Sequence, residues 1–474
     1  MAGKYKMYLG GRWVDCQNRI RVESPYDGAL IGTVAAASKK DYTKAIKIAN
    51  ETFRITRDLP AYKREETCLA IASGLERNLE KLARMMTREL GKTLRDSRGE
   101  VGRSIGVFRT AAEEAKRIGG EIIDLDWNPG SEERLGLVRR FPRGVIAGIS
   151  PFNFPLNLVA HKIAPAIASG NTIVLKPASA TPILALKLAE IIDKTDHPKG
   201  AVSILPGSSR ECTPLLEDPR VKLITFTGSS EVGWWIKEHS GRKEVVLEMG
   251  GNAGVIIADD ADLGFATSRL LIGAFAVAGQ SCISVQRIYV HEKVYARFLR
   301  MFKSKVAQLK TGNPLNPKTD IGTMVTKEAV KATMDTIRTA VKGGARVLTG
   351  GMARKNVIKP TVLTDVKKSM DVCCKEAFAP LVIVQKYRSF KKAVDEINDS
   401  VYGLQAGIFT NRMKDVFYAF KRIECGGVVI NDIPTYRADH QPYGGMKDSG
   451  IGREGIRYSI EDMTEVKILS MNLK

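Results

Sequence analysis

The chain has 474 residues, of which 44% are hydrophobic, and its formal net charge is +21. This length exceeds what one simple hydrophobic core supports, so we expect two or three domains. No low-complexity tract and no internal repeat is visible. The composition therefore favours an ordinary soluble protein of several domains.

The positive charge is spread thinly along the chain. Basic residues occur as pairs, such as Lys39-Lys40 and Arg139-Arg140, and not as patches. A nucleic-acid-binding protein concentrates such residues on one surface, so we expect no nucleic-acid partner. Attraction of anionic substrates and cofactors is a milder consequence of the same charge.

Membrane, disulfide and metal signals are weak. The longest apolar run, near Leu270 to Ala278, is far shorter than a bilayer span, and residues 1–13 do not resemble a signal peptide. The seven cysteines are odd in number and form no Cys-x-x-Cys pair, so neither a disulfide framework nor a zinc site is indicated. We expect no membrane association, no bound metal and a reducing, cytoplasmic location.

The first 140 residues predict helices and a hairpin. A short strand pair is expected between Met7 and Pro25. Apolar residues then recur at helical spacing, first from Ala45 to Phe53 and then in a longer stripe from Leu69 to Met86. A further helix is expected from Thr93 to Ile118. Residues 121–140 predict two strands joined by a turn, which form either an oligomerisation hairpin or an ordinary surface hairpin.

Strands and helices alternate from Gly144 to Glu248. Strands are expected at residues 145–149, 172–176, 201–205, 223–227 and 244–248, with helices at 156–168, 182–192, near 213 and at 231–239. Short strands of Val, Ile and Leu are typical of a parallel sheet buried on both faces. The alternation predicts an α/β fold whose ligands bind beyond the carboxyl ends of the strands. Ser150 to Asn153, Lys176, Gly228-Ser229 and Glu248 fall at such ends.

A second α/β segment is expected from Gly250 to about Gly426. Its elements are predicted at residues 288–290, 294–309, 380–384 and 406–410. Gly444-Gly445 and Ser449-Gly450 are typical of loops. A last strand is expected from Val466 to Met471.

Cys282 is the candidate nucleophile. An isolated cysteine is more often a small buried hydrophobic residue. Three features favour the nucleophile here: the βαβ pattern upstream, the turn at Glu248-Met249-Gly250-Gly251 and the elbow at Pro151-Phe152-Asn153-Phe154-Pro155. A covalent redox mechanism uses all of these parts.

Asn153 and Glu248 could support that chemistry. A thiol that attacks an aldehyde forms a thiohemiacetal oxyanion, to which the Asn153 amide and the Cys282 backbone N–H could donate; loss of one such donor costs about 10²–10³ in rate. Glu248 ends a buried strand, where desolvation raises a carboxyl pKa toward that of a useful general base for thioester hydrolysis. Alternatively, Asn153 is a turn residue and Glu248 caps a strand end.

A dinucleotide site is indicated by the segment from Gly228 to Gly233. It joins a strand to a helix, where glycines let the backbone approach a pyrophosphate, although an ordinary βα turn is the alternative. Lys176 could bind ribose hydroxyls. Ser179 lacks the charge that would repel a 2′-phosphate by roughly 4 kcal/mol at ~4 Å and an effective dielectric of ~20, so the sequence permits NADP as well as NAD. Alternatively, Lys176 and Ser179 merely cap the following helix.

Together the motifs resemble those of the aldehyde dehydrogenase superfamily over nearly the whole chain. In chain order they are Pro151-Phe152-Asn153-Phe154-Pro155, Lys176-Pro177, Phe226-Thr227-Gly228-Ser229, Leu247-Glu248-Met249-Gly250-Gly251, Gly279-Gln280-Ser281-Cys282, Lys375-Glu376-Ala377-Phe378-Ala379-Pro380, and Pro442-Tyr443-Gly444-Gly445 with Ser449-Gly450. The resemblance implies an NAD(P)-dependent enzyme with Cys282 as nucleophile, Glu248 as general base and Asn153 as oxyanion donor. It implies Glu376 on the nicotinamide-side ribose, with Phe378 beside it. The implied cofactor-binding residues are Ser150, Pro151, Phe152, Lys176, Ser179, Gly228, Ser229, Gly233, Met249, Glu376 and Phe378.

The resemblance also implies the domain organisation. It predicts two Rossmann-like parallel-sheet domains and a β oligomerisation hairpin, in a homodimer or homotetramer. The boundaries expected are 1–120 and 142–249 for the cofactor-binding domain, 250–427 for the catalytic domain, 428–454 for a returning segment with the substrate loop, and 121–141 with 455–474 for oligomerisation.

The substrate is less well defined. Phe152 replaces a tryptophan common in the family, and residues 375–380 vary the usual motif while keeping Glu376. Residues 279–285, with Asn431-Asp432, resemble members that act on lactaldehyde, phosphonoacetaldehyde or glyceraldehyde 3-phosphate. Arg103 and Arg437 lie where such enzymes anchor substrates, and a guanidinium suits phosphate or carboxylate. Two solvated arginines are the alternative. We expect a short hydroxylated or anionic aldehyde as the small-molecule substrate.

Two other functions compete with this hypothesis. A coenzyme A-acylating relative is disfavoured by Glu248, which can activate water. A non-catalytic protein on the same scaffold is disfavoured because both the nucleophile and the base are present.

Overall fold

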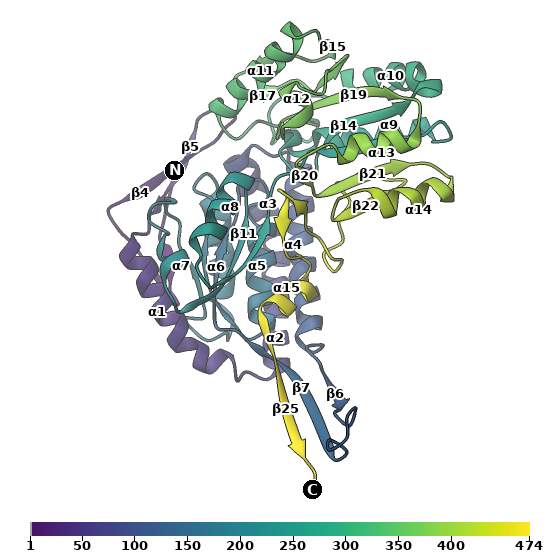
Figure 1. Ribbon diagram of the computed structural model, residues 1–474. Helices are drawn as coiled ribbons and strands as arrows, with labels where there is room; N and C mark the ends of the chain where they lie inside the picture. The colour runs from purple at the N-terminus through teal and green to yellow at the C-terminus, as the bar shows by residue number, and fades with distance from the viewer. Residues whose placement is uncertain (1) are drawn as a thin grey trace.

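The computed structural model describes residues 2–474, which form two lobes around parallel sheets and a narrow extension (Figure 1). Each lobe has its own hydrophobic core. The predicted α/β fold with two parallel-sheet units is therefore confirmed. Within residues 2–474, no helix is both long and apolar enough to cross a membrane.

The first sheet has eight strands in the order β24-β12-β11-β8-β9-β10-β2-β3. Its five middle strands, from β12 to β10, run parallel, because helices connect them. The strands are β2 (Met7–Leu9), β3 (Arg12–Val14), β8 (Val145–Ile149), β9 (Thr172–Lys176), β10 (Val202–Ile204), β11 (Val221–Thr227), β12 (Glu244–Glu248) and β24 (Gly450–Ile451). The alternation predicted between Gly144 and Glu248 is confirmed.

Helices cover both faces of this sheet. One face carries α5 (Asn157–Ala168) and α6 (Pro182–Ile192), backed by α2 (Ala61–Arg77), α3 (Leu79–Leu90) and α4 (Leu94–Ala115). The other face carries α1 (Lys39–Thr56), α7 (Pro214–Glu217) and α8 (Ser230–His239). The strands between them are buried on both sides, as their composition predicts.

Two expectations about local structure were wrong. The apolar stripe from Leu69 to Met86 is divided between α2 and α3, because the chain leaves the helical conformation at Asn78, and Leu69 is 43% exposed. The pair Ser449-Gly450 is typical of a loop, yet Gly450 begins strand β24 and pairs with Glu248 of β12. Local sequence propensity could not predict the break between α2 and α3 or the strand at Gly450, because both features depend on tertiary packing.

The second sheet has seven strands in the order β15-β18-β19-β14-β13-β21-β22, and only the edge strand β15 is antiparallel. The strands are β13 (Ala253–Ile257), β14 (Val285–His291), β15 (Arg346–Thr349), β18 (Thr361–Thr364), β19 (Leu381–Tyr387), β21 (Gln405–Phe409) and β22 (Gly427–Ile430). The helices are α9 (Leu263–Phe275), η1 (Ala276–Gly279), α10 (Glu292–Ala307), α11 (Lys327–Lys342), α12 (Asp371–Cys374), α13 (Phe390–Asn398) and α14 (Met413–Arg422).

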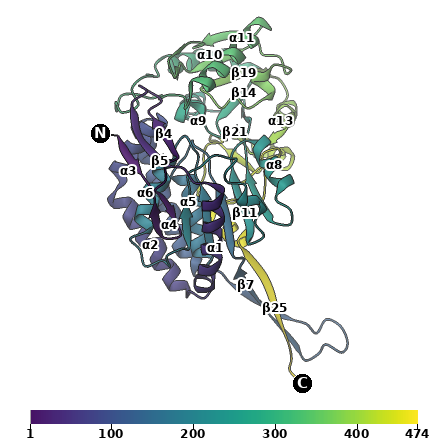
Figure 2. The ribbon, with the colours of Figure 1, turned by 90° about the vertical axis from the view of Figure 1, so that its left-hand side faces the viewer.

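The extension is a three-stranded antiparallel sheet that projects away from both lobes (Figure 2). It consists of β6 (Gly120–Asp124), β7 (Arg134–Pro142) and β25 (Thr464–Asn472), with β7 in the middle. The helix α15 (Ile456–Asp462) precedes β25 and packs against α4 and α5. The remaining strands are β1 (Gly3–Tyr5), β4 (Arg19–Glu23), β5 (Leu30–Ala35), β16 (Ala353–Arg354), β17 (Val357–Ile358), β20 (Tyr402–Gly403) and β23 (Met446–Lys447).

Candidate active site

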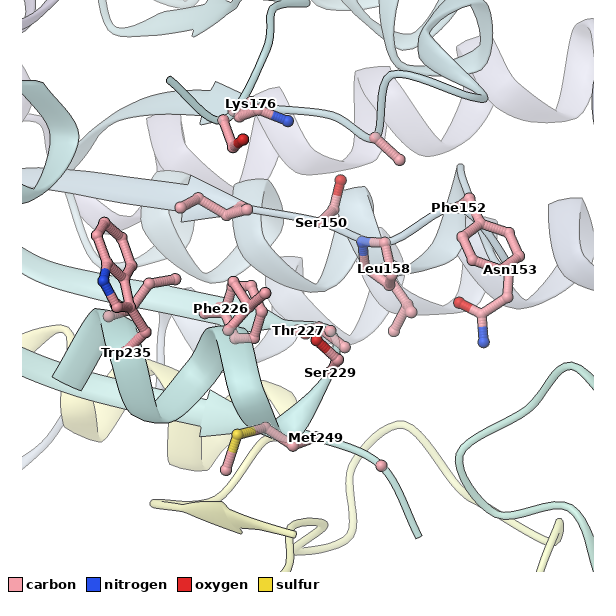
Figure 3. Close-up of a pocket in the computed structure, with 18 of the residues that line it drawn as sticks. Ser150, Phe152, Asn153, Leu158, Lys176, Phe226, Thr227, Ser229, Trp235 and Met249 are labelled. Carbon is pink, nitrogen blue, oxygen red and sulfur yellow. The ribbon is translucent and has the colours of Figure 1, made fainter. Parts of the chain in front are cut away.

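A cavity of about 550 Å³ lies at the carboxyl ends of strands β8, β9, β11 and β12. Figure 3 shows Asn153 and Phe152 at one end and Trp235 at the other. The predicted site residues that line the cavity are Ser150, Pro151, Phe152, Asn153, Lys176, Gly228, Ser229, Met249, Cys282, Glu376 and Phe378. The fold therefore brings segments that are far apart in the sequence to one cavity.

Cys282 follows a left-handed turn in the backbone. Val277, Ala278 and Gly279 have φ values of 55°, 54° and 68°. The conformation is unfavourable by roughly 1–2 kcal/mol for each residue with a side chain. Only glycine fits at position 279, because a Cβ there would lie 2.1 Å from the carbonyl oxygen of Ala379. The turn ends the apolar helix α9 and places Cys282 in the cavity wall.

The buried side chain of Gln280 holds this turn in place. Its Nε2 donates to the carbonyl oxygens of Val277 at 3.1 Å and Thr323 at 3.2 Å. Its Oε1 accepts from the backbone N–H of Val325 at 2.9 Å. These bonds fix the backbone two residues before Cys282.

The Cys282 sulfur has two polar neighbours. Sγ lies 3.4 Å from Glu248 Oε1 and 3.3 Å from the hydroxyl of Tyr443. Burial, and then the nearby Glu248 carboxyl, raise the pKa of the thiol well above its usual value. A base in contact with the sulfur is therefore required to form a thiolate at neutral pH.

Glu248 is the last residue of β12 and is 2% exposed. Burial, and then the neighbouring Glu454, raise the pKa of Glu248 to about 8. Glu454 instead carries the negative charge: although burial opposes this, Lys162 at 3.5 Å and Arg437 at 3.1 Å hold its pKa well below the usual range. A carboxyl whose pKa lies near the working pH can both accept and release a proton.

Asn153 touches the loop that carries Cys282. Its Nδ2 donates to the carbonyl oxygen of Gln280 at 3.0 Å, and its Oδ1 accepts from the Phe154 N–H at 3.1 Å. The amide retains a second N–H. The backbone N–H of Cys282 also makes no hydrogen bond within the part of the chain that the structure describes. Two donors are thus available near the sulfur.

A buried ion pair supports the elbow around Asn153. The Glu100 carboxylate accepts from the N–H groups of Leu156 and Asn157, at 2.9 and 3.1 Å, where α5 begins. Lys92 pairs with Glu100 at 2.5 Å, and its ammonium lies 3.9 Å from the centre of the Phe154 ring. A carboxylate at a helix N-terminus is favoured by the helix dipole. The sequence did not predict this support.

Glu376 and Gly250 fit closely together. Glu376 Oε1 accepts from the Gly251 N–H at 3.0 Å, and a Cβ on Gly250 would lie 2.3 Å from Glu376 Oε2. Burial raises the pKa of Glu376 to about 7. Next to it, the rings of Phe152 and Phe378 meet edge to face with their centres 5.9 Å apart. These groups form the wall of the cavity near Cys282.

The far end of the cavity contains Lys176 but not Ser179. Lys176 Nζ makes only a long contact of 3.4 Å to the Pro177 carbonyl, and burial lowers its pKa. The Ser179 hydroxyl donates to the Gly207 carbonyl at 3.0 Å and does not line the cavity. Gly233 is also outside the lining; a Cβ there would lie 2.1 Å from Met249 Sδ, so it allows α8 to approach β12 closely.

The two candidate substrate arginines differ in exposure. Arg103, on α4, pairs with Asp439 at 2.9 Å and its side chain is 36% exposed. The Arg437 side chain is 5% exposed; it pairs with Glu454, and its guanidinium carbon lies 3.7 Å from the centre of the Tyr443 ring. Neither arginine lines the cavity. Arg437 is therefore not a solvated arginine.

Comparison with known proteins identifies the family. The sequence profile of the aldehyde dehydrogenase family matches residues 13–469. The chain belongs to this family. The 3-sulfolactaldehyde dehydrogenase of Priestia megaterium is 42% identical over 471 residues, which are 99% of this chain and 98% of that protein. The predicted family, fold class and enzyme class are thus confirmed.

Two solved aldehyde dehydrogenases have nearly the same fold. Aldehyde dehydrogenase 21 from Physcomitrella patens, crystallised with the reaction product succinate, is 44% identical, with a TM-score of 0.98 over 100% of this chain and 99% of that chain. The glyceraldehyde-3-phosphate dehydrogenase of Methanocaldococcus jannaschii, crystallised with NADP, is 37% identical, with a TM-score of 0.93 over 96% of this chain and 100% of that chain.

Sequence reasoning missed several residues of this aldehyde dehydrogenase. Lys162 was recognisable, because it is a lysine in the middle of the apolar helix α5. Tyr443 belongs to a quoted motif but was assigned no role. Glu454 gave no signal, since it follows a glycine-rich loop and only the fold brings it to Lys162. Cys212 and Trp235, which line the far end of the cavity, were missed for the same reason.

Proposed function

We propose that this aldehyde dehydrogenase oxidises a short hydroxylated or anionic aldehyde to the carboxylic acid, with NADP⁺ or NAD⁺ as hydride acceptor. The proposal rests mainly on one observation. Cys282 Sγ is 3.4 Å from a buried carboxyl, and Asn153 bonds to the same loop two residues before the cysteine. The proposed nucleophile, base and oxyanion donor thus lie close together at one end of the cavity.

In this proposal Glu248 accepts the thiol proton and the Cys282 sulfur bonds to the aldehyde carbon. The Asn153 amide and the Cys282 N–H donate to the resulting oxyanion. Loss of hydride from the carbon leaves a thioester on the sulfur. Glu248 releases the first proton to solvent and then takes a proton from water. The water oxygen bonds to the carbonyl carbon, the carbon–sulfur bond breaks, the sulfur leaves as a thiolate and the acid is released. Glu454 stays negatively charged throughout, paired with both Lys162 and Arg437.

The groove suits a dinucleotide. Ser150 Oγ is buried without a partner among residues 2–474, Glu376 lies against Gly250, and α8 begins just after Gly228-Ser229. A helix N-terminus favours an anion such as a pyrophosphate. These residues would hold the dinucleotide, with Lys176 toward its adenosine end; the bound nicotinamide supplies the hydride acceptor. Ser179 lies outside the cavity lining and adds no negative charge beside it, so both NADP and NAD remain in the proposal.

The substrates and products named for the relatives favour an anionic group distant from the aldehyde. Those named for three relatives carry a sulfonate, a phosphate or a carboxylate, whereas the lactaldehyde named for others carries no charge. Arg103 is the more exposed of the two arginines, with a side chain that is 36% exposed, and Asp439 engages only its Nη2. We infer that Arg103 contacts the anion directly and that Arg437, which is buried, acts through its neighbours.

We also infer an oligomer, a dimer or tetramer, assembled through residues 121–141 and 455–474. The extension exposes apolar side chains, among them Ile122 at 69%, Val466 at 57% and Ile468 at 48%. Exposed apolar surface of this kind favours a protein partner. We also propose the domain boundaries given above. A reducing, cytoplasmic location is proposed as well, and the seven free thiols support it.

The test is an assay of NAD(P)H formation with both cofactors. We expect sulfolactaldehyde, glyceraldehyde 3-phosphate, lactaldehyde or succinic semialdehyde to have higher kcat/KM than hexanal or benzaldehyde, without added coenzyme A. Cys282→Ala should abolish turnover. Arg103→Gln should reduce kcat/KM about 10–100-fold for the anionic substrates but not for lactaldehyde, since a hydrogen bond to a charged group contributes about 1.5–3 kcal/mol.

Arg109→Gln is the matched control, because Arg109 lies on the same helix but pairs with Glu76 at the surface. We expect it to leave kcat/KM unchanged. A preference for long apolar aldehydes would refute the substrate class, and a requirement for coenzyme A would refute hydrolysis.

A further inference from the structure

The Tyr443 side chain is almost completely buried beside Cys282. It is 2% exposed, and its ring packs against Ile283 and Leu404. Its hydroxyl lies 3.3 Å from Cys282 Sγ, and within residues 2–474 the sulfur is the only hydrogen-bond partner of that hydroxyl. A buried hydroxyl without any partner is unfavourable, so we expect the Tyr443 hydroxyl to form a hydrogen bond with the sulfur. Which of the two atoms donates the proton remains to be assigned.

The direction follows from the number of protons. A thiol has one hydrogen, and the Cys282 thiol can donate it to Glu248 Oε1 at 3.4 Å. The sulfur must then accept from the Tyr443 hydroxyl. Once Glu248 has taken the thiol proton, the sulfur can only accept. Burial holds the pKa of Tyr443 well above its ordinary value, so the phenol keeps its proton while the thiol loses one.

Arg437 fixes the orientation of this phenol. Its guanidinium carbon lies 3.7 Å from the centre of the Tyr443 ring, on which a planar cation stacks well. Glu454 also holds the guanidinium, through Nη2 at 3.1 Å. A positive charge next to the ring stabilises negative charge on the phenol oxygen, so it makes the hydroxyl a stronger donor.

We propose that Tyr443 is a further catalytic residue, whose hydroxyl donates a hydrogen bond to the Cys282 thiolate, and that Arg437 is its positioning residue. The inference rests on the proposed role of Cys282 as nucleophile. It explains how a thiolate forms in a buried place beside a carboxyl, where few groups favour a negative sulfur. Hydrogen bonds to an ion are about twice as strong as neutral ones.

The bond has a consequence for the two halves of the reaction. The sulfur is negative before it attacks the aldehyde, and it is neutral in the thioester. It becomes negative again only when it leaves, after the slower attack by water, because a thiolate is a good leaving group. Tyr443 should therefore accelerate acylation of Cys282 and have little effect on hydrolysis of the acyl-enzyme. A merely structural role would not separate the two steps in this way.

The test is the pH dependence of alkylation of Cys282 by iodoacetamide, which needs no substrate or cofactor. Mass spectrometry distinguishes Cys282 from the other six cysteines. In Tyr443→Phe we expect the midpoint to rise by about one pH unit and the rate at pH 7 to fall about tenfold. In single turnovers, acylation should slow by a similar factor while hydrolysis changes less than about twofold.

Tyr289→Phe is the control, because Tyr289 is also 2% exposed and its hydroxyl bonds to Glu396 in the second lobe, away from the cavity. Its alkylation profile should match the wild type. An unchanged midpoint in Tyr443→Phe, or a lower one, would overturn the inference. If Cys282→Ala keeps its activity, the proposed function itself fails; if that variant is inactive and only the Tyr443→Phe midpoint stays unchanged, this inference alone fails.

Discussion

The two parallel sheets end differently at their carboxyl edges. In the first sheet, polar groups at this edge are left without good partners. Ser150 Oγ and Glu248 Oε2 make no hydrogen bond to residues 2–474, and Lys176 Nζ makes only one of 3.4 Å. All three groups are buried. An unpaired buried polar group is unfavourable unless a ligand forms a hydrogen bond with it.

In the second sheet, the part of the carboxyl edge formed by the ends of β13 and β21, here called the closed edge, is paired within itself. Arg412 binds Asp259 at 2.7 Å. Asp260 accepts from the Thr410 hydroxyl at 2.9 Å and from the Asn411 N–H at 2.8 Å. These bonds leave little capacity for a ligand.

The difference shows that a strand end places polar side chains at the sheet edge but does not by itself make a binding site. A parallel sheet places side chains at a common edge, and this applies equally to both sheets. A binding site arises only where those groups are not already paired with one another. The second sheet instead contributes Cys282 and Glu376, from loops outside its strands, to the cavity of the first.

The largest effect is expected from removing the base at the open edge. Glu248→Gln should lower kcat by about 10²–10⁴, because no other group contacting the sulfur can activate water. Acylation should slow as well, because Glu248 also accepts the thiol proton, so mass spectrometry of the variant with substrate should detect little acylated Cys282. Asp260→Asn makes the same kind of change at the closed edge, and an equal loss of activity there would contradict the comparison.

Loss of the Asn153 amide should have the next largest effect. We expect Asn153→Ala to lower kcat/KM by about 10²–10³, since one oxyanion donor is removed. Binding of NADPH, followed by fluorescence, should change little. If cofactor binding weakens as much as kcat/KM, Asn153 supports the shape of the groove and not the chemistry.

The pH dependence of thioester hydrolysis sharpens the role of Glu248. Its pKa is raised to about 8, so below this pH the carboxyl is protonated and cannot act as a base. The rate in a single turnover should fall about tenfold per pH unit below 8 and level off above it. This limb should be missing in Glu248→Gln. A flat wild-type profile between pH 6 and 9 would assign the base to another group.

The smallest effect on activity is expected at the closed edge. Asp260→Asn should leave kcat/KM within about twofold of the wild type. It should lower the free energy of unfolding by about 1–2 kcal/mol, measured by urea denaturation, because hydrogen bonds to a charged acceptor are weakened. A large loss of activity with unchanged stability would mean that the second sheet also takes part in the site.

The regular part of the fold was predictable from the sequence. Apolar strands alternate with helices between Gly144 and Glu248, and the period of each is set by local geometry. The ends of those strands also indicated Ser150, Lys176 and Glu248. What could not be predicted depends on contacts between distant segments: the division of α2 from α3 and the partners of Glu248.

The same limit applies to the site. Asn153 and Cys282 could be selected by their motifs, but the support from Glu100 and Lys92 has no local signature. The left-handed turn before Cys282 was also hidden, because Val277 and Ala278 rarely adopt that conformation without tertiary constraint.

The pairing of β24 with β12 has a consequence for biosynthesis. Glu248 lies on a strand whose outer neighbour is Gly450–Ile451, and both Tyr443 and Glu454 come from the same late segment. While a ribosome is still translating the middle of the message, the nascent polypeptide already contains the thiol, Asn153 and Glu248, but it lacks Tyr443, Glu454 and the strand that pairs with β12. Reactivity of the cysteine is thus assembled only near the end of translation, after the chain is almost complete.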